Sequence, residues 1–415
     1  MFRPKIKHVR HPIRTLTTAT KLLAIYVDIW RFGRHSYRAY RRDIRFNLDN
    51  VSRGFAAHCD DSCDDTEILR RICKAYARAI KDEPFAPEAY RASGWWQRVR
   101  DSSLGPVMRA LAAQDIPALA HMYRNFFRDA CSTGLVSVPY SMSNAYFSEK
   151  IRNLHRRFYL GNALQTLDYW EKQTGGSFQL HALAGPDIGN PFGILLNGTL
   201  VRTGAAYQHY AARGIIENLD SMPATVVEIG GGYGGTAYYL LRDRPGVRYI
   251  DFDVPESLAL TSYYLLRSFP QLTFLLYGED NHAANTFADA DVVLMPTYAI
   301  DSLPDRIADV VFSSHALSDL SSGAMEVYLP TVERITKGRF LYIGDAKGVR
   351  LIESSARRSL HHLQLRERKD SLWNRTVTGA EEVECLFAPS SRTRERCTGN
   401  DARREEREQW HSLAR

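Results

Sequence analysis

The sequence predicts an α/β protein built on a doubly wound parallel sheet, with a mostly helical N-terminal half. Two observations lead to this fold class. From Val226 to Ile343, short apolar runs alternate with segments of helical periodicity, which is typical of buried parallel strands joined by helices. The first apolar run ends in a glycine-rich turn that opens a helix, and ligands of such sheets bind at the carboxyl ends of the strands.

The composition changes along the 415 residues, which are enough for more than one domain. We expect a basic arm in residues 1–50, a mostly helical domain in 51–204 as an acceptor or lid region, the sheet domain in 205–389 and a polar, charged tail in 390–415. Pro4 and Pro12 argue against helix at the start of the arm. Helical spacing of apolar residues predicts helices over Thr66–Lys81, Val107–Ala113, Ile116–Ala130 and Ala145–Trp170.

The sheet domain is predicted element by element from the same patterns. Helices are expected over Ala205–Leu219, Thr236–Arg242, Ser257–Ser268 and Ala324–Ile335. Strands are expected over Val226–Ile229, Val247–Phe252, Val310–Phe312 and Phe340–Ile343. Either the run that ends in "LLYGED" or the run "VVLMPTY" from Val292 can be the third strand. The spacing to the next strand favours Val292, which leaves Gln271–Ala288 as an insertion.

Positive charge is concentrated near the N-terminus. The chain carries a net charge of +7, and residues 1–46 hold twelve Lys and Arg against two acids. A basic segment that also contains Leu, Ile, Tyr and Trp is a candidate for contact with an anionic membrane surface; the alternative is a solvated arm packed on the body. Because the rest of the chain is not basic, nucleic acid is not an expected partner.

No apolar run approaches the ~20 residues of a membrane-spanning helix. The expected location is therefore the cytoplasm, with the arm a candidate for contact with the inner face of the membrane, and the oligomeric state stays open. The six cysteines are irregularly placed, and their only cluster is Cys59, Cys63 and Cys73. A zinc site needs tightly spaced ligand pairs, so we expect free thiols and no metal site.

The glycine-rich turn fits two templates at once. Gly230, Gly232 and Gly235 fit the dinucleotide fingerprint, while Gly230, Gly232 and Gly234 fit a tighter alternating pattern. A dinucleotide would bring its pyrophosphate to the helix N-terminus, where a preceding acid would repel it. Glu228 stands two residues before the first glycine, so it favours a cofactor with a cationic head, such as S-adenosylmethionine.

Acids at the end of the next strand suit a nucleoside. Asp251 and Asp253 follow the glycines by about twenty residues, where a ribose diol needs an acceptor, and at a spacing of two they share a face of the strand. Dinucleotides share this requirement, so the proline turn in "FDVPES", Phe252–Ser257, adds weight. A third feature is "ADVVFSSHALSDL", Ala308–Leu320, a strand running into a polar turn at the expected cleft.

Together these motifs resemble those of class I S-adenosylmethionine-dependent methyltransferases, and more narrowly those of the bacterial sugar O-methyltransferases. The resemblance covers about Gly185 to Gly344 and is carried by "GNP" at Gly189–Pro191, "VVEIGGGYGG" at Val226–Gly235, "IDFDVPESLALTSYYLL" at Ile250–Leu266 and "YLPTVERI" at Tyr328–Ile335. It implies a Rossmann-like methyltransferase sheet, the cofactor S-adenosyl-L-methionine, and O-methylation of a sugar hydroxyl in bacterial glycan or polysaccharide biosynthesis.

The resemblance also implies roles for particular residues. The residues expected around the methionine portion are Glu228, Gly230, Gly231, Gly232, Tyr233 and Gly234; Asp253 is expected on the ribose hydroxyls, and Ser314 is a further cofactor-site candidate. "FDVP" is similar to the "FDLP" element of plant small-molecule O-methyltransferases, in which a histidine after strand four is the general base. The matching position here holds Ser318, with His315 three residues earlier and Asp319 directly after it.

Transfer of a methyl group to a hydroxyl requires alignment and removal of the hydroxyl proton. Imidazole titrates near neutrality, so His315 is the candidate base, and Asp319 either acts itself or orients the imidazole. The alternatives are that His315 packs the turn and that Asp319 is a helix N-cap. Tyr207, His209 and Tyr210 are either acceptor contacts or ordinary helix packing.

Three other functions stay open on the sequence alone. The closest is O-methylation of another small molecule. An NAD-dependent oxidoreductase and a catalytically silent Rossmann-like scaffold are the others. Binding of S-adenosylhomocysteine compared with NAD separates the oxidoreductase from a methyltransferase, and cofactor binding without methyl transfer to any glycan favours the scaffold.

Overall fold

The computed structural model describes residues 30–58, 64–136, 153–279, 289–373 and 382–390, together with Val27. Several expectations fall outside these residues: those for Pro4 and Pro12, for Cys59 and Cys63, for the start of the helix predicted from Ala145, and for the tail after Ser390. Among the helices that are described, none is both long and apolar enough to cross a membrane.

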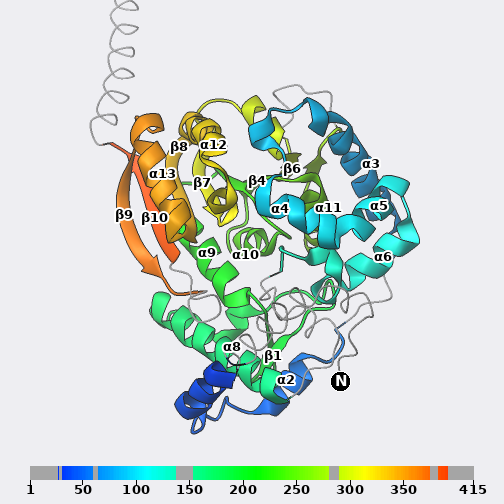
Figure 1. The fold of residues 1–415 in the computed structure, drawn as a ribbon, viewed down its shortest axis with the longest axis vertical. Coiled ribbons are helices and arrows are strands. Elements are labelled where there is room, and N and C mark those ends of the chain that lie inside the picture. Colours follow the sequence, from blue (N-terminus) through cyan, green and yellow to red (C-terminus); the bar gives the residue numbers. More distant parts are fainter. Residues whose placement is uncertain are drawn as a thin grey trace, which may run out of the picture.

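An eight-stranded sheet forms the centre of the molecule (Figure 1). Its strands lie in the order β5-β6-β4-β3-β7-β8-β10-β9. Their bounds are β3 Ala224–Ile229, β4 Val247–Asp253, β5 Phe274–Leu276, β6 Val292–Pro296, β7 Ala308–Ser314, β8 Thr336–Asp345, β9 Leu363–Ser371 and β10 Glu382–Pro389. All neighbours from β5 to β8 are parallel, and β10 is inserted antiparallel between β8 and β9.

After β3, the chain first adds β4 and β6 on one side of it and then adds β7 and β8 on the other side. The topological switch point therefore lies between β3 and β7, where ligands bind in such sheets. The order β6-β4-β3-β7-β8 is the doubly wound order that the sequence predicts, and Val292 does begin the third strand beside β4. The run of the rejected alternative contributes the short edge strand β5.

Helices cover both faces of the sheet. On one face, residues such as Val226 and Tyr249 pack with the helices α9 Ala205–Glu217, α10 Gly235–Asp243 and α11 Pro255–Ser268. On the other face, residues such as Val227 and Ile250 pack with α12 Ser322–Ile335 and α13 Ala346–Ser359. Alternation along a strand sends Glu228 to the same face as Val226, toward α10 and α11.

The N-terminal half is mostly helical, as predicted. Its elements are α2 Leu48–Gly54, α3 Thr66–Asp82, α4 Gly94–Val99, a π-helical turn Arg100–Leu104, α5 Gly105–Ala113, α6 Ile116–Arg124 and α8 Asn153–Gln173, with short 3₁₀ turns Glu83–Phe85, Glu88–Tyr90, Phe126–Arg128, Ala130–Ser132 and Leu180–Leu183. In Figure 1 the helices α3, α5 and α6 lie beside α11, and their buried side chains belong to the same core as those of α9, α10 and α11. The two halves are therefore packed into one hydrophobic core.

Buried ion pairs reinforce this junction. The carboxylate of Asp65, at the start of α3, is 1% exposed and accepts hydrogen bonds from Arg124, from Tyr263 of α11 and from Arg267 of α11. Arg100 is paired in the same way with Glu256, in the first turn of α11. A buried carboxylate is tolerated only when such partners compensate its lost hydration.

Two features of the chain were absent from the sequence-based expectations. Residues before α9 form a hairpin of β1 Gly193–Leu196 and β2 Thr199–Arg202 around Asn197-Gly198, a dipeptide that favours tight hairpin turns. The region after β8 was expected to belong to the sheet domain, but no elements were assigned to it; it forms α13, β9 and β10. Earlier in the sheet domain, short 3₁₀ turns follow β6 (Thr297–Ser302) and β7 (Ala316–Asp319).

Candidate functional site

The carboxyl ends of β3 and β7 open onto a cavity of about 510 Å³. Its walls come from the glycine turn after β3, from Ser314 and His315 at the end of β7, and from the N-terminal turn of α9. Other parts of the wall come from α8, from residues 132–136 and Trp95 of the helical half, from residues 201–203 and from Trp373. The cavity thus lies at the switch point and between the two halves of the chain.

Glu228 is the buried acid of this site. Its side chain is 2% exposed, it lines the cavity, and its Oε2 accepts a hydrogen bond of 2.7 Å from the hydroxyl of Tyr249 on β4. Burial, together with the charge of nearby Asp253, raises the pKa of Glu228 to about 7, against the lowering effect of the Tyr249 hydroxyl. A cation in the cavity would favour the ionised carboxylate, so the site is suited to a positively charged ligand.

The glycines of the turn are required by its backbone. Gly230 has φ +83°, and a Cβ there would overlap the Cβ of Ala316 in the turn after β7. A Cβ on Gly231 would lie 2.7 Å from the carboxylate oxygens of Asp251. Gly232 and Gly234 also have positive φ, a region that glycine enters without steric cost. The turn can therefore approach both a ligand and the acids of β4 closely.

Asp251 and Asp253 both hold the turn, as expected for residues on one face of β4. Asp251 Oδ1 accepts from the Gly231 amide at 3.0 Å, and Asp253 Oδ2 accepts from the Gly232 amide at 3.0 Å. Asp253 also accepts hydrogen bonds of 2.7 Å from the Ser257 hydroxyl and from the Val254 amide. Burial raises the pKa of Asp253 to about 6 and holds that of Asp251 well above its usual range.

Asp251 and Asp253 differ in how far their carboxylates are buried and bonded. Asp251 is fully buried, and its Oδ2 has no hydrogen-bond partner among the described residues. Asp253, the residue expected on the ribose, is only partly buried, and the described cavity does not reach it. Asp251 is therefore enclosed, and Asp253 is the acid of the pair with exposed surface beyond the glycine turn.

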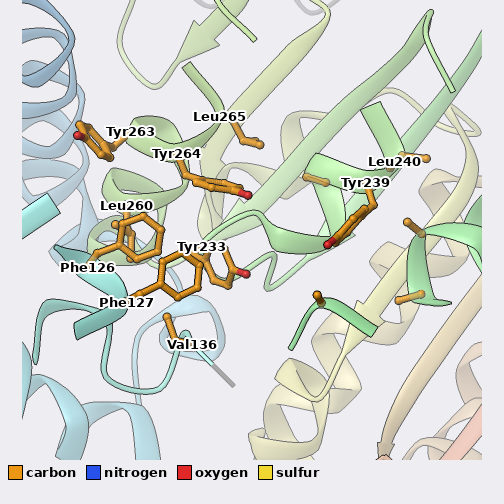
Figure 2. Packing of buried hydrophobic residues seen from close by; sticks show 14 of the residues in the cluster. Phe126, Phe127, Val136, Tyr233, Tyr239, Leu240, Leu260, Tyr263, Tyr264 and Leu265 are labelled. Atoms are coloured by element: carbon orange, nitrogen blue, oxygen red, sulfur yellow. The ribbon is translucent and has the colours of Figure 1, made fainter. Parts of the chain in front are cut away.

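Tyr233 has a structural position within the turn. Figure 2 shows its ring beside Phe126 and Phe127, and the ring centroids are 5.6 and 5.4 Å away. Its hydroxyl donates to Gln208 Oε1 at 2.8 Å, and both residues touch the cavity wall. Tyr233 thus anchors the glycine turn to the helical half. Gly234, the last of the expected cofactor contacts, packs against α11 and is not part of the wall.

His315 is held by a hydrogen-bond chain on the cavity wall. Its Nε2 lies 2.6 Å from Oε1 of Glu382, the first residue of β10, which is 2% exposed. Its Nδ1 lies 3.0 Å from the Ser314 hydroxyl, which in turn contacts the hydroxyl of Tyr207. A carboxylate beside Nε2 stabilises the tautomer with the proton on that nitrogen, which leaves Nδ1 as the basic nitrogen. This is the arrangement of a general base with an orienting acid.

Asp319, the second predicted catalytic residue, ends the 3₁₀ turn Ala316–Asp319, and its side chain lies outside the described structure. The orienting acid of His315 in the structure is Glu382, which the sequence did not point to. The two are 67 residues apart, and only the antiparallel pairing of β10 with β8 brings them together. N-capping of α12 is performed by Ser321, whose side chain accepts from the Ala324 amide.

The three aromatic and histidine candidates of α9 have different surroundings. Tyr207 lines the cavity and is in contact with Ser314. His209 is 1% exposed, accepts a hydrogen bond from Trp170, and burial lowers its pKa to about 4, so it is a neutral packing residue. Tyr210 donates to Glu384 Oε2 at 2.6 Å. Of the three, Tyr207 is placed to meet a ligand.

Trp373 is a cavity residue that the sequence did not point to. It is 6% exposed, and its ring centroid lies 5.5 Å from that of Tyr207 and 5.1 Å from that of Tyr210. Its indole nitrogen is buried and has no hydrogen-bond partner within the described ranges. A tryptophan in such a place offers a ligand both an apolar ring and an unused donor.

Arg202 brings a buried positive charge to the edge of the cavity. Its guanidinium carbon lies between 5.4 and 5.9 Å from the ring centroids of Phe127, Tyr238, Tyr239 and Tyr264. Cation–π contacts and the Tyr264 hydroxyl stabilise it without a carboxylate partner among the described side chains. The other acidic or basic side chains of the described cavity wall are Glu228 and His315.

The part of the chain that the structure describes contains no cluster of metal ligands. There, no three His, Cys, Asp or Glu side chains come together in a way that could hold an ion. Cys73 is a buried free thiol, and burial raises its pKa to about 11.

Solved structures match the chain at low similarity, whereas no protein-family model and no curated protein matches it. A geranyl diphosphate methyltransferase in complex with S-adenosylmethionine is 11% identical with a TM-score of 0.33, over 44% of this chain and 85% of that chain. A magnesium protoporphyrin IX methyltransferase from Synechocystis with bound S-adenosylmethionine is 10% identical with a TM-score of 0.32, over 44% and 78%. A TehB-like S-adenosylmethionine-dependent methyltransferase from Corynebacterium glutamicum is 14% identical with a TM-score of 0.29, over 55% and 98%.

Similarity at this level carries no inference about activity or ligand, so the fold class rests on the strands themselves. Six parallel strands, β5 to β8 in the order of the sheet, extend to both sides of β3, helices cover both faces, and the antiparallel strand β10 is inserted near the edge. The chain has a doubly wound, Rossmann-like α/β fold, the class that its sequence predicts.

Proposed function

We propose that the protein is an S-adenosylmethionine-dependent O-methyltransferase whose acceptor is a sugar hydroxyl. The observation that carries the proposal is the buried carboxylate of Glu228, set before a glycine turn at the switch point of the sheet. Across the same cavity stands a second functional group, the His315–Glu382 pair. A receptor for a cation and a base for a hydroxyl are the two groups that this reaction requires.

The acids at the ends of β3 and β4 support a cationic nucleoside over a dinucleotide. Glu228, Asp251 and Asp253 lie beside one glycine turn, and burial, with the charges of neighbouring acids, raises the pKa of all three. A pyrophosphate at this turn would add negative charge to the cluster, whereas an ammonium and a sulfonium would offset it. S-adenosylmethionine, when bound, supplies an electrophilic methyl group. Glu228 and the turn from Gly230 are the residues that would hold its methionine portion, and Asp253, the less buried of the two acids at the end of β4, would accept from its ribose hydroxyls.

The chain's own part in the reaction is to take a proton from the acceptor hydroxyl. Nδ1 of His315 is the basic nitrogen, because Glu382 holds the proton on Nε2. The imidazolium that results is stabilised by the buried Glu382 carboxylate. The Ser314 hydroxyl, 3.0 Å from Nδ1 and in contact with Tyr207, holds the imidazole on the cavity wall, and an acceptor hydroxyl would take its place at Nδ1.

The rest of the cavity wall supports a neutral, hydroxyl-rich ring as acceptor. Apart from Glu228, His315 and the aromatic-caged Arg202, the described wall is uncharged. It offers aromatic rings and neutral polar side chains, namely Trp95, Tyr159, Asn162, Thr166, Thr203, Tyr207 and Trp373. Sugars expose an apolar face of C–H groups and a rim of hydroxyls, which such a wall matches by ring contact and hydrogen bonds.

The test combines binding with turnover. Calorimetry should detect binding of S-adenosylhomocysteine and no binding of NAD. In a turnover assay, labelled methyl from S-adenosylmethionine should be transferred to sugars of a cell-envelope extract. His315→Asn and Glu382→Gln should lower turnover by about 10²- to 10⁴-fold while S-adenosylhomocysteine still binds, because they remove proton transfer and not cofactor contacts. His361→Asn, an exposed histidine on another surface, is the matched control.

Each alternative has its own outcome in this test. NAD binding without S-adenosylhomocysteine binding would replace the proposal by an oxidoreductase. Cofactor binding with label in no extract would favour a silent scaffold. Label in a non-sugar product would leave the methyltransferase but refute the sugar acceptor.

A further inference from the structure

The N-terminal helix, residues 30–40, is fixed to α8 by one of its faces. The ring of Phe32 packs edge-on against that of Phe158 at 4.9 Å, and Ser36 lies where a Cβ on Gly161 would stand. One turn further, the Tyr40 hydroxyl donates to Asp168 Oδ2 at 2.9 Å. Residues 32, 36 and 40 are four apart, so a single stripe of the helix is used for docking. In Figure 1 this helix, in dark blue, lies against α8 at the edge of the molecule.

The opposite face of the helix is basic and aromatic. It presents Trp30, Arg34, Tyr37, Arg38 and Arg41, whose spacings of three and four also define one stripe. Trp30 is 51% exposed and Tyr37 is 48% exposed. Two rings on this face are covered by cations, since Arg34 lies over Trp30 and Arg157 of α8 lies over Tyr37. The turn after the helix adds Ile44, which is 95% exposed.

The charges of this surface are not neutralised within the described structure. Five exposed arginines have no carboxylate partner there: Arg31, Arg34, Arg38, Arg41 and Arg42. The acids next to them are already engaged, because Arg45 pairs with both Asp43 and Asp168. We define the basic docking surface as Trp30, Arg31, Arg34, Tyr37, Arg38, Arg41, Arg42 and Ile44.

We propose that the basic docking surface binds an anionic phospholipid membrane. Guanidinium groups are attracted to anionic headgroups, and tryptophan and tyrosine favour the interface between headgroups and acyl chains. An isoleucine almost fully exposed to water gains by transfer into that interface. Nucleic acid is also negatively charged, but it has no apolar layer that could take up Ile44. A membrane therefore accounts for both the arginines and the exposed apolar side chain of this surface.

Co-sedimentation with vesicles tests this with the full chain. The protein should bind vesicles of phosphatidylcholine mixed with phosphatidylglycerol and should not bind phosphatidylcholine alone. The variant Arg34→Gln/Arg38→Gln/Arg41→Gln should bind the mixed vesicles about a hundredfold more weakly, at roughly fivefold for each arginine lost. The matched control is Arg70→Gln/Arg98→Gln/Arg350→Gln, which removes the same charge from three exposed arginines elsewhere.

A second variant separates lipid from other polyanions. Ile44→Ser leaves the charge intact, so it should weaken binding to mixed vesicles and leave any binding to single-stranded DNA unchanged. If the two triple arginine variants lost the same amount of binding to mixed vesicles, a specific binding surface would be refuted. Equal binding of the wild-type protein to both kinds of vesicle would refute it as well. Binding to DNA without binding to vesicles would assign the surface to nucleic acid instead.

Discussion

Replacement of Glu228 by Gln gives the sharpest test of the cofactor assignment. The amide keeps the size of the side chain and can still accept from the Tyr249 hydroxyl, now 2.7 Å from Oε2, but it has no charge. A hydrogen bond to a charged group contributes about 1.5–3 kcal/mol. Removal of the charge should therefore weaken S-adenosylmethionine binding by roughly 10- to 150-fold.

The pH dependence of binding makes this prediction specific. The pKa of Glu228 is raised to about 7 in the ligand-free protein, so the group is neutral below that pH and ionised above it. A cationic ligand needs the ionised form, so the affinity should fall as the pH falls. Between pH 7.5 and pH 6 the ionised fraction drops about eightfold, and the affinity should drop with it. Asp253, whose pKa is raised to about 6, contributes in the same direction at the acidic end.

The assay is isothermal titration calorimetry with S-adenosylmethionine from pH 6 to pH 7.5, a range in which its own α-amino group stays largely protonated. The wild-type protein should show the fall in affinity, and Glu228→Gln should show a weaker affinity with most of the slope gone. Glu353→Gln, a carboxyl paired with Arg368 on the surface, should behave like the wild type. Wild-type affinity in Glu228→Gln, or a flat wild-type profile, would refute the role of this carboxylate.

The remaining predictions concern the pH response, the turn and the junction of the halves. Tyr249→Phe removes a hydrogen bond that lowers the pKa of Glu228, so the midpoint of the same calorimetric profile should move to higher pH. Gly230→Ala places a Cβ at φ +83° and should cost about 1–3 kcal/mol in denaturant melts, whereas Gly323→Ala, with no close neighbour, should not. Asp65→Ala removes a buried carboxylate that pairs with the partly exposed Arg124 and Arg267 and should cost about 3 kcal/mol in the same melts, the lower end for a broken buried pair.

The central sheet was predictable because its strands are buried on both faces and are therefore continuous apolar runs. The segment at Val226 is such a run, and its interruption by Glu228 before the glycines is what pointed to a ligand. The strands at the β9 edge of the sheet could not be predicted from apolar runs. Strand β9, Leu363–Ser371, has seven consecutive exposed residues and reads as a charged loop. The Asn197-Gly198 hairpin did carry a local signal, the dipeptide itself, that could have identified β1 and β2.

The candidate site was predictable only where its residues are neighbours in sequence. Glu228 and the glycines form one motif, and Ser314 and His315 follow the next strand of the sheet. Glu382 joins His315 through strand pairing over 67 residues, and no pattern around it marks that partnership. Trp373 likewise comes from a segment without periodicity. Orienting acids and acceptor contacts are assembled by topology, which a single sequence does not reveal.

The buried carboxylate of Asp65 bears on how this protein can be divided and recombined. Its partners Arg267 and Tyr263 belong to α11, which directly follows the acids of β4. A fragment that begins at α9 would leave that arginine and tyrosine facing solvent beside an exposed apolar core. The helical half is therefore not an exchangeable module, and a chimera with new acceptor specificity would need α3 and α11 from the same parent.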